Sequence, residues 1–306
     1  MSMRIYTMTH KKFTPLPDPL YVPLHVGRAC GENLGYLGDD TGEQISALNC
    51  YYSELTGFYW IWKNCHDADY VGTCHYRRYL INEKEQIYTE EEYRELLRKY
   101  DLVTTKKVQL NNSYYDGFLA NHNIRALEMT GKVITEKYPE YADAFEQLVN
   151  GRQTYFGNIL VTSKILFDEY ASWLFSIFFE VAERIELETG EDAYHKRVFG
   201  FISEFLLLVW VTVKKLRVYE CKVGMLGEKA ETGELKRCLA ECFRNRDVDL
   251  AKKIFLETNE DNYAARRVYE KCGFVLEGKH RNEYISAEGR VLCRMYYGLL
   301  KGELSE

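Results

Sequence analysis

The residues best able to do chemistry stand in one short stretch, Asp69–Leu80, with the sequence DYVGTCHYRRYL. Its first half, YVGTC, consists of β-favouring and small residues and predicts a strand. His75, Arg77 and Arg78 follow at once, and a core strand cannot bury an imidazole and two guanidiniums without partners. We therefore expect an anion site here, because open α/β sheets bind ligands at the carboxyl ends of strands. The alternative is a surface turn with a few basic residues.

A second basic turn follows the first predicted strand, Arg4–Thr9, which contains Thr7. His10 and Lys11 begin this turn, and the end of a first strand is a usual place for a nucleotide in an α/β domain. The prolines that follow predict an extended loop over Phe13–Pro23. The sequence thus offers two basic strand ends for one anionic ligand.

Acidic and polar groups stand near these turns in the sequence. Asp39 and Asp40 lie in a turn-rich segment that ends at Ser46, a good N-cap for a helix over 47–64. Glu54 and Asn64 are polar residues of this otherwise apolar helix, and their roles are less easily assigned. Asp39 and Asp40 are candidate ligands of a metal ion or of a ribose.

Residues 189–204 concentrate further chemistry around a predicted hinge at Gly200. Asp192 and Glu204 are candidate general bases, and Arg197 is a candidate substrate contact. Each carboxylate also has a plainer explanation, because Asp192 can cap a helix and Glu204 can pair with Arg197. The loop predicted over 111–123 holds Tyr115 and Asp116, which can line an acceptor pocket or belong to an ordinary surface loop.

The elements that position these residues alternate between strands and helices. This alternation predicts a mixed, mostly parallel α/β domain over residues 1–225 and a smaller α+β unit over 226–306. The predicted strands are 4–9, 69–80, 101–105, 156–162 and 216–223, then 253–258, 274–281 and 291–299. The predicted helices are 47–64, 89–99, 124–138, 141–149 and 163–187, then 234–245 and 262–272.

Composition excludes several classes of protein. The chain has 306 residues and a net charge of −6, which argues against a dedicated nucleic-acid binder. Its 9 cysteines include no CxxC pair, so we expect reduced thiols of a cytoplasmic protein and no zinc site. The N-terminus lacks the apolar region of a signal peptide, and the most hydrophobic run, 199–213, is too short to span a bilayer.

Six blocks in order resemble the glycosyltransferase-like proteins of bacterial capsule and exopolysaccharide gene clusters, the domain of unknown function 4422. The blocks are IYTMTHKK, DDTGEQIS, YYSELTGFYWIWKN, DYVGTCHYRRYL, YFGNILVTSKILFDEYASWLF and RVFGFISEFLLLVW. The resemblance implies a GT-A-like fold, a UDP-sugar donor, a glycan or lipid-linked acceptor and transfer of a hexosyl unit. UDP-galactofuranose is one candidate donor. Peripheral association with the inner face of the cell membrane and homo-oligomers stay open.

Glycosyl transfer releases a nucleoside diphosphate, and its charge must be stabilised as the bond breaks. Many GT-A enzymes use Mn²⁺ or Mg²⁺ held by an Asp-x-Asp. Here the corresponding strand end offers arginines, which bind phosphate without a metal, so we expect Arg77 or Arg78 to act catalytically. Metal dependence through Asp39 and Asp40 stays the alternative. The expected donor-binding residues are Thr7, His10, Lys11, Asp39, Asp40, Asn64, His75, Arg77 and Arg78. The expected acceptor-binding residues are Tyr115, Asp116, Asn158 and Arg197.

The last part of the chain resembles the C-terminal half of a GNAT acetyltransferase. The matching residues are Asn262, Ala265, Tyr269, Glu270, Lys271, Gly273 and Phe274. The glycine-rich loop that binds the CoA diphosphate in that family is missing, and only ETGEL stands in its place. Acetyl transfer, a structural remnant and a non-catalytic glycan-binding subunit are therefore the alternatives to glycosyl transfer.

Overall fold

The structure is a computed structural model that describes residues 2–187, 196–226, 256–259, 275–285 and 291–298. It divides the chain into two compact units, residues 1–226 and 227–306. Each unit is described by itself. In the second unit, β11 (Leu256–Asn259), β13 (Val291–Gly298) and β12 (Val275–Ile285) form an antiparallel sheet in that order. The predicted GNAT-like residues 262–274 lie outside the described residues.

An eight-stranded sheet forms the first unit, in the order β3-β2-β1-β4-β5-β10-β6-β9, with β9 also paired to β4. Its strands are β1 (Met3–Thr9), β2 (Tyr21–His25), β3 (Leu37–Gly38), β4 (Tyr70–His75), β5 (Arg78–Ile81), β6 (Leu102–Thr105), β9 (Leu160–Ser163) and β10 (Val218–Met225). β7 (Val108–Gln109) and β8 (Gln153–Thr154) form a separate pair. The mixed α/β class is as predicted. The expected parallel majority is confirmed, because β1, β2, β3, β4, β6 and β10 run in the same direction, whereas β5 and β9 pair antiparallel with their neighbours.

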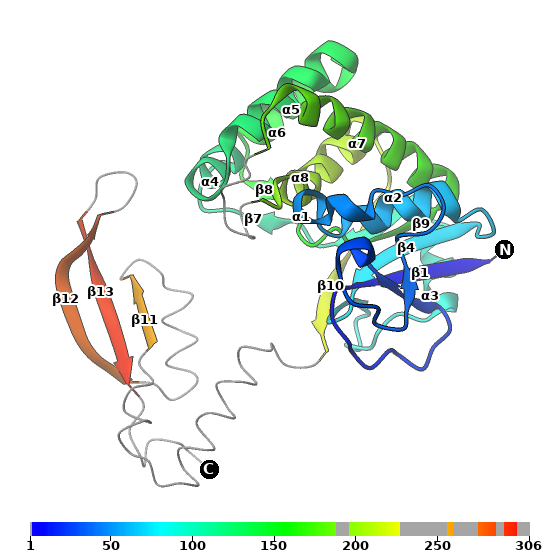
Figure 1. Ribbon diagram of the computed structural model, residues 1–306, viewed down its shortest axis with the longest axis horizontal. Helices are drawn as coiled ribbons and strands as arrows, with labels where there is room; N and C mark the ends of the chain where they lie inside the picture. Colours follow the sequence, from blue (N-terminus) through cyan, green and yellow to red (C-terminus); the bar gives the residue numbers. More distant parts are fainter. Residues whose placement is uncertain (1, 188–195, 227–255, 260–274, 286–290, 299–306) are drawn as a thin grey trace, which may run out of the picture. The chain divides into compact units, whose positions relative to one another are not determined.

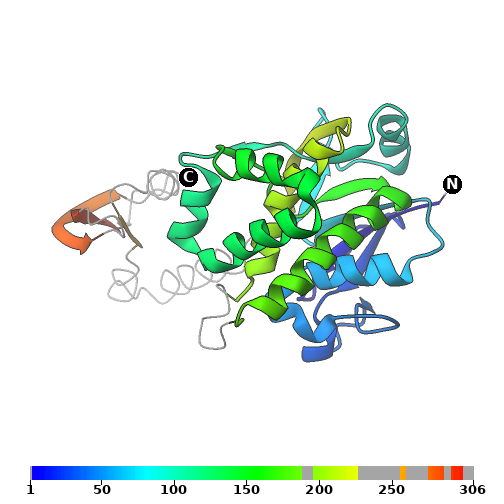
Figure 2. The same ribbon diagram turned by 90° about the horizontal axis from the view of Figure 1, so that it is seen from above.

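Helices cover the sheet, and most of them lie on one side of it (Figure 1). They are α1 (Asn49–Tyr52), α2 (Leu55–Asn64), α3 (Glu90–Leu97), α4 (Tyr114–Asn121), α5 (Ile124–Lys137), α6 (Ala142–Val149), α7 (Lys164–Arg184) and α8 (Val198–Val213), with short 3-10 turns at Arg28–Cys30, Ser46–Leu48 and Pro139–Tyr141. Figure 2 shows α2 and α7 running across the strands. None of the described helices is long and apolar enough to cross a bilayer.

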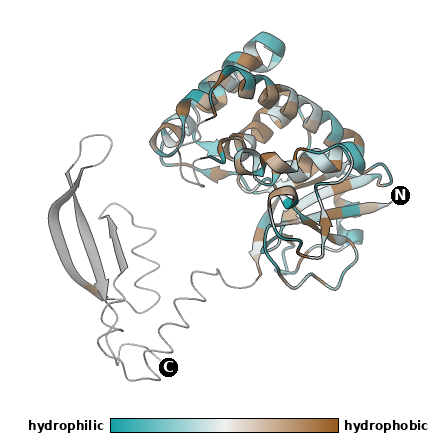
Figure 3. Ribbon diagram, in the orientation of Figure 1, coloured by the Kyte–Doolittle hydropathy of each residue, from teal (hydrophilic) through white to brown (hydrophobic). Residues whose placement is uncertain are grey.

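Two hydrophobic clusters lie on opposite faces of the sheet. Alternate side chains of β1 show the division, because Tyr6 belongs to the cluster under the helices and Ile5 to the other. Tyr93 of α3 packs in the second cluster. α5 and α7 carry both hydrophobic and hydrophilic residues, as expected of helices with one packed and one outer face (Figure 3).

The structure corrects four local predictions. The predicted loop 13–23 runs into β2, and Pro23 is tolerated where β3 leaves one edge of β2 unpaired. The predicted helix 47–64 breaks at Ser53 into α1 and α2. The predicted loop 111–123 contains α4, whose first turn is capped by the Ser113 hydroxyl accepting from the Asp116 N–H. The predicted hinge at Gly200 is a buried position inside α8.

Candidate functional site

The carboxyl ends of three parallel strands meet at one edge of the sheet. In the ladder β1 pairs with β4 at Met8 and His75, and with β2 at Thr9 and His25. The segments that leave these strand ends therefore lie side by side, although they are far apart in the sequence. This brings the turn beginning at His10 and the turn beginning at Tyr76 to one place, as the two basic motifs predicted.

Basic side chains crowd this edge. Desolvation by the surrounding protein lowers the pKa of His10, and Lys11, Arg197, His75 and His25 lower it further. We call these five residues the cationic edge. Lys11 and Arg197 supply the permanent positive charge. Among the described residues no ion pair neutralises Lys11 or Arg197. The cationic edge is therefore suited to a ligand with more than one negative charge.

The strand that carries His75 turns back at once instead of running on. β4 ends at His75, and β5 begins at Arg78, which pairs with His75. Tyr76 in the turn packs edge-on against His10, with ring centroids 5.8 Å apart, and the Arg77 guanidinium lies 5.5 Å from the Tyr76 ring centroid. Arg78 is exposed. The turn thus presents two arginines beside the cationic edge.

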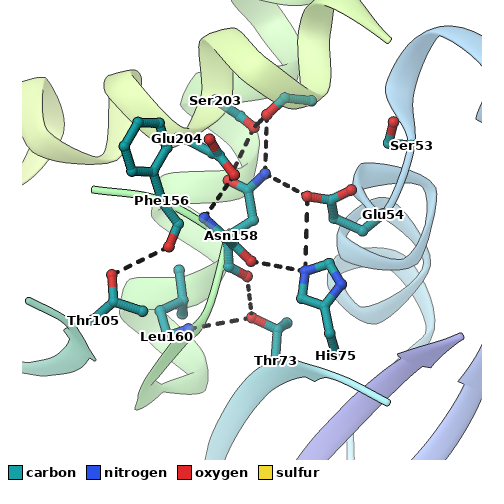
Figure 4. Close-up of polar contacts among 12 residues, drawn as sticks. Ser53, Glu54, Thr73, His75, Thr105, Phe156, Asn158, Leu160, Ser203 and Glu204 are labelled. Carbon is teal, nitrogen blue, oxygen red and sulfur yellow. Dashed lines mark hydrogen bonds and ion pairs between the residues drawn. The ribbon is translucent and has the colours of Figure 1, made fainter. Parts of the chain in front are cut away.

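A second group of polar side chains joins β4, β9, α8 and the break between α1 and α2 (Figure 4). We call it the polar cluster, and it consists of Glu54, His75, Asn158, Ser203 and Glu204. Nδ2 of Asn158 donates to Oε1 of Glu54 at 2.7 Å, and Oγ of Ser203 donates to Oδ1 of Asn158 at 3.0 Å. His75 belongs to both regions and connects them.

Glu204 lies half-buried in the polar cluster. Its Oε1 accepts a hydrogen bond of 2.6 Å from the backbone N–H of Gly157. Burial, and then the nearby negative charge of Glu54, raise its pKa to about 8, while the Gly157 hydrogen bond and Arg78 act in the opposite direction. This carboxyl exchanges its proton close to neutral pH, which suits a general base. The predicted alternative pairing with Arg197 does not occur.

The two aspartates proposed as metal ligands both have protein partners. Asp39 is buried, and its oxygens accept hydrogen bonds from the backbone N–H groups of Gly27 and Arg28 and from the Ser46 hydroxyl. Asp40 lies 3.3 Å from Nε of Arg28 and has one buried oxygen without a described partner. Most oxygens of the two carboxylates therefore already have protein partners, and metal binding by Asp39 and Asp40 stays a prediction. The described residues contain no cluster of three or more metal-ligating side chains.

Other predicted site residues have structural partners. Thr7 is buried beside the Cys74 thiol, and the side-chain amide of Asn64 binds the backbone of Glu43 and Trp60. The Asp116 carboxylate accepts from Ser113 at the start of α4. These three roles in ligand binding stay predictions that the geometry does not favour. Asp192 lies outside the described residues.

Tyr115 lies away from the polar cluster. Its hydroxyl donates to Glu128 at 2.8 Å, and both residues line a hollow of 830 Å³ whose other walls come from α5 and α6. This lining shares no residue with the cationic edge or the polar cluster. Tyr115 therefore lines a hollow to which Arg197 does not contribute.

Sequence reasoning did not assign Glu54, Ser203, His25 or Arg28 to the site. His25 and Arg28 fall on a strand end that the sequence did not predict. The visible signal for Glu54 was a carboxylate within an apolar helical pattern. Its partner Asn158 stands 104 residues away, so nothing local in the sequence indicates their contact.

Comparisons with known proteins agree with this geometry. The family DUF4422, described as a domain of unknown function, matches residues 4–215. Among solved structures, the chain resembles the apo structure of the bifunctional glycosyltransferase WbbM, with 31% sequence identity and a TM-score of 0.70. The similarity covers 74% of this chain and 46% of WbbM, so the chain spans less than half the length of that relative. No curated protein matches. Because the match extends over more than half of its length, the chain belongs to the DUF4422 family.

Proposed function

We propose that the chain is a glycosyltransferase that moves a hexosyl unit from a UDP-sugar to a glycan or lipid-linked acceptor in surface polysaccharide synthesis. The likeness to a bifunctional glycosyltransferase at 31% identity supports a transferase with a GT-A-like first unit. Galactofuranose is the candidate sugar implied by the family resemblance. A lipid-linked acceptor would bring the protein to the inner face of a membrane.

The observation that carries this proposal is the cationic edge at the ends of parallel strands. In the reaction, the bond between the anomeric carbon and the phosphate oxygen breaks, and its electron pair leaves with UDP. The leaving diphosphate gains negative charge, which preorganised cations stabilise. Arg77 and Arg78 can bind phosphate oxygens through two N–H groups each, with His10 and Lys11 close by.

Transfer also requires removal of the proton from the attacking hydroxyl group of the acceptor. In the proposal this proton passes to the carboxylate of Glu204, while the hydroxyl oxygen bonds to the anomeric carbon. A base with a pKa near the working pH accepts a proton effectively and still returns it to solvent. Glu204, whose pKa is about 8, meets this condition. Asp192 is the second candidate.

The test measures UDP binding by isothermal titration with and without EDTA. We expect wild-type protein to bind UDP in EDTA, and the double variant Arg77→Ala, Arg78→Ala to lose about 10- to 100-fold in affinity. Arg125→Ala is the matched control, since Arg125 is an exposed arginine outside both regions. Equal affinity in all three proteins, or binding that requires Mn²⁺, would contradict the arginine mechanism. Absence of turnover with UDP-hexoses despite UDP binding would favour a non-catalytic glycan-binding subunit.

A further inference from the structure

The backbone at Ser53 is strained. Its φ of 51° and ψ of −132° lie in a region that L residues rarely adopt. The Ser53 carbonyl accepts from Nδ2 of Asn49 at 2.7 Å and from Oγ1 of Thr56 at 3.2 Å, which holds this conformation. Gly200 of α8 lies against it, because a Cβ atom there would come within 3.1 Å of the Ser53 side chain. Such strain is concentrated at functional sites.

The residue that this strained turn presents is Glu54. Besides the bond from Asn158, Oε1 of Glu54 lies 3.9 Å from Nε2 of His75 (Figure 4). Asn158 cannot rotate freely, because its Nδ2 also donates to the carbonyl of Gly200 at 3.0 Å and its Oδ1 accepts from Ser203. Both N–H groups of Asn158 and its side-chain oxygen therefore have partners within the protein. This leaves Asn158 suited to holding Glu54, rather than to the acceptor contact predicted from the sequence.

The contacts of His75 determine where its proton lies. Nε2 of His75 is 2.8 Å from the carbonyl oxygen of Gly157. A carbonyl only accepts, so Nε2 must carry the hydrogen. The Glu54 carboxylate, which lies on the Nε2 side of the ring, also favours a hydrogen on Nε2. No hydrogen bond from a described residue reaches Nδ1, which Figure 4 shows on the side of the ring away from Asn158.

We propose that Glu54 is a positioning residue of this site, which holds His75 with its proton on Nε2 and so keeps Nδ1 available to a hydroxyl group of the bound sugar. This rests on the proposed glycosyl transfer, because the ligand of Nδ1 is the sugar whose diphosphate occupies the cationic edge. A neutral Nδ1 accepts a hydrogen bond from a hydroxyl group but not from an unprotonated phosphate oxygen. His75 would thereby distinguish the sugar from the diphosphate beside it.

Glu54 has a second effect, on Glu204. The charged and titratable groups that act on Glu204 are Glu54, Arg78 and the buried Tyr114. Burial first, and then the negative charge of Glu54, oppose ionisation of Glu204 and raise its pKa. Glu54 therefore influences both the position of the proton on His75 and the ionisation of Glu204, through contacts that are fixed in the fold.

The test is Glu54→Gln, which keeps the shape of the side chain and removes its charge. Long-range ¹H–¹⁵N correlation spectra of His75 report its tautomer, and ¹³C-labelled glutamate reports the titration of Glu204. We expect the wild-type protein to show the proton on Nε2, and the variant to titrate Glu204 at lower pH, by roughly one pH unit. Glu54→Asp, which keeps the charge, should leave the titration of Glu204 nearer to that of the wild type.

The control is Glu180→Gln, a surface carboxylate on α7 paired with Arg184, which should leave the His75 tautomer and the Glu204 titration unchanged. An unchanged Glu204 midpoint in Glu54→Gln, or a wild-type His75 with its proton on Nδ1, would overturn the proposal. The spectra need no substrate, so they decide it even if UDP-sugars are not turned over. If UDP-sugars are turned over, kcat/KM should rise with pH as Glu204 ionises. In Glu54→Gln this rise should move to lower pH together with the Glu204 midpoint. A purely structural role of Glu54 would not cause that shift.

Discussion

The cationic edge and the polar cluster meet at His75, yet their residues are distributed very differently along the chain. Much of the basic charge at and beside the cationic edge comes from runs of neighbours, namely His10-Lys11 and His75 with the two arginines that follow it. The polar cluster is assembled by contacts over long separations, from Asn158 to Glu54 across 104 residues and from Gly157 to Glu204 across 47. Charge that gathers locally is visible in a sequence, whereas a hydrogen-bond network across distant segments is not.

The two regions also differ in which property of the protein a substitution would impair. Exposed charges such as Arg78 contribute ligand affinity and little stability. Buried groups such as Asn158 contribute both stability and the placement of a proton, because an unpaired polar group inside the fold is costly. Variants in the cationic edge should therefore affect UDP binding, and variants in the polar cluster should affect turnover and folding.

The largest effect is expected from Glu204→Gln. If Glu204 accepts the acceptor proton, the variant should lose about 10²- to 10⁴-fold in kcat while UDP affinity stays within a factor of two or so. Steady-state kinetics and UDP titration measure the two effects separately. Glu169→Gln is the control, since Glu169 forms a surface ion pair with Lys214. Wild-type turnover in Glu204→Gln would transfer the role of base to Asp192.

Asn158→Ala should be the most destabilising change in the polar cluster. It removes three side-chain hydrogen bonds, leaves Glu54 and Ser203 without this partner, and places alanine at a φ of 47°. We expect a loss of about 3 kcal/mol in the free energy of unfolding. Denaturant unfolding measures it. Asn150→Ala, which removes bonds at an exposed position, should cost less than about 0.5 kcal/mol. Equal losses in both variants would contradict the role assigned to Asn158.

The raised pKa of Glu204 also predicts how stability depends on pH. The folded protein keeps the Glu204 proton up to about pH 8, whereas the unfolded chain releases it near the usual glutamate value of 4.5. Between these values the folded state binds more protons, so its stability falls as pH rises, by up to about 1.4 kcal/mol per pH unit. Glu204→Gln should remove this slope, and unfolding free energies of both proteins at pH 5, 6, 7 and 8 would measure the difference. Parallel curves would refute the raised pKa.

The sequence predicted the cationic edge better than the polar cluster, because the edge depends on local properties and the cluster on contacts between distant segments. Strand β4 and the basic turn after it were predictable because β-favouring residue types and side-chain charge are local properties of the sequence. The break at Ser53 was not, since only packing against Gly200 and the bonds to its carbonyl make that backbone conformation tolerable. Glu204 was found as an acidic residue, but its partner Gly157 comes from a strand entry that no local pattern identifies.

The smallest effect is expected from Ser53→Gly, which tests whether the strained backbone at Ser53 is needed for function. Ser53→Gly should relieve backbone strain of about 1–3 kcal/mol and remove a buried hydroxyl group that has no described partner, against an entropy cost of about 1 kcal/mol for glycine. We expect a net gain of about 1 kcal/mol in denaturant unfolding, together with slower transfer because Glu54 is held less firmly. Glu85→Gly is the matched control, because Glu85 has a φ of 60° in an exposed turn and should gain stability without any change in rate. A Ser53→Gly variant that gains stability and keeps the full rate would mean that the strained turn has no part in positioning Glu54.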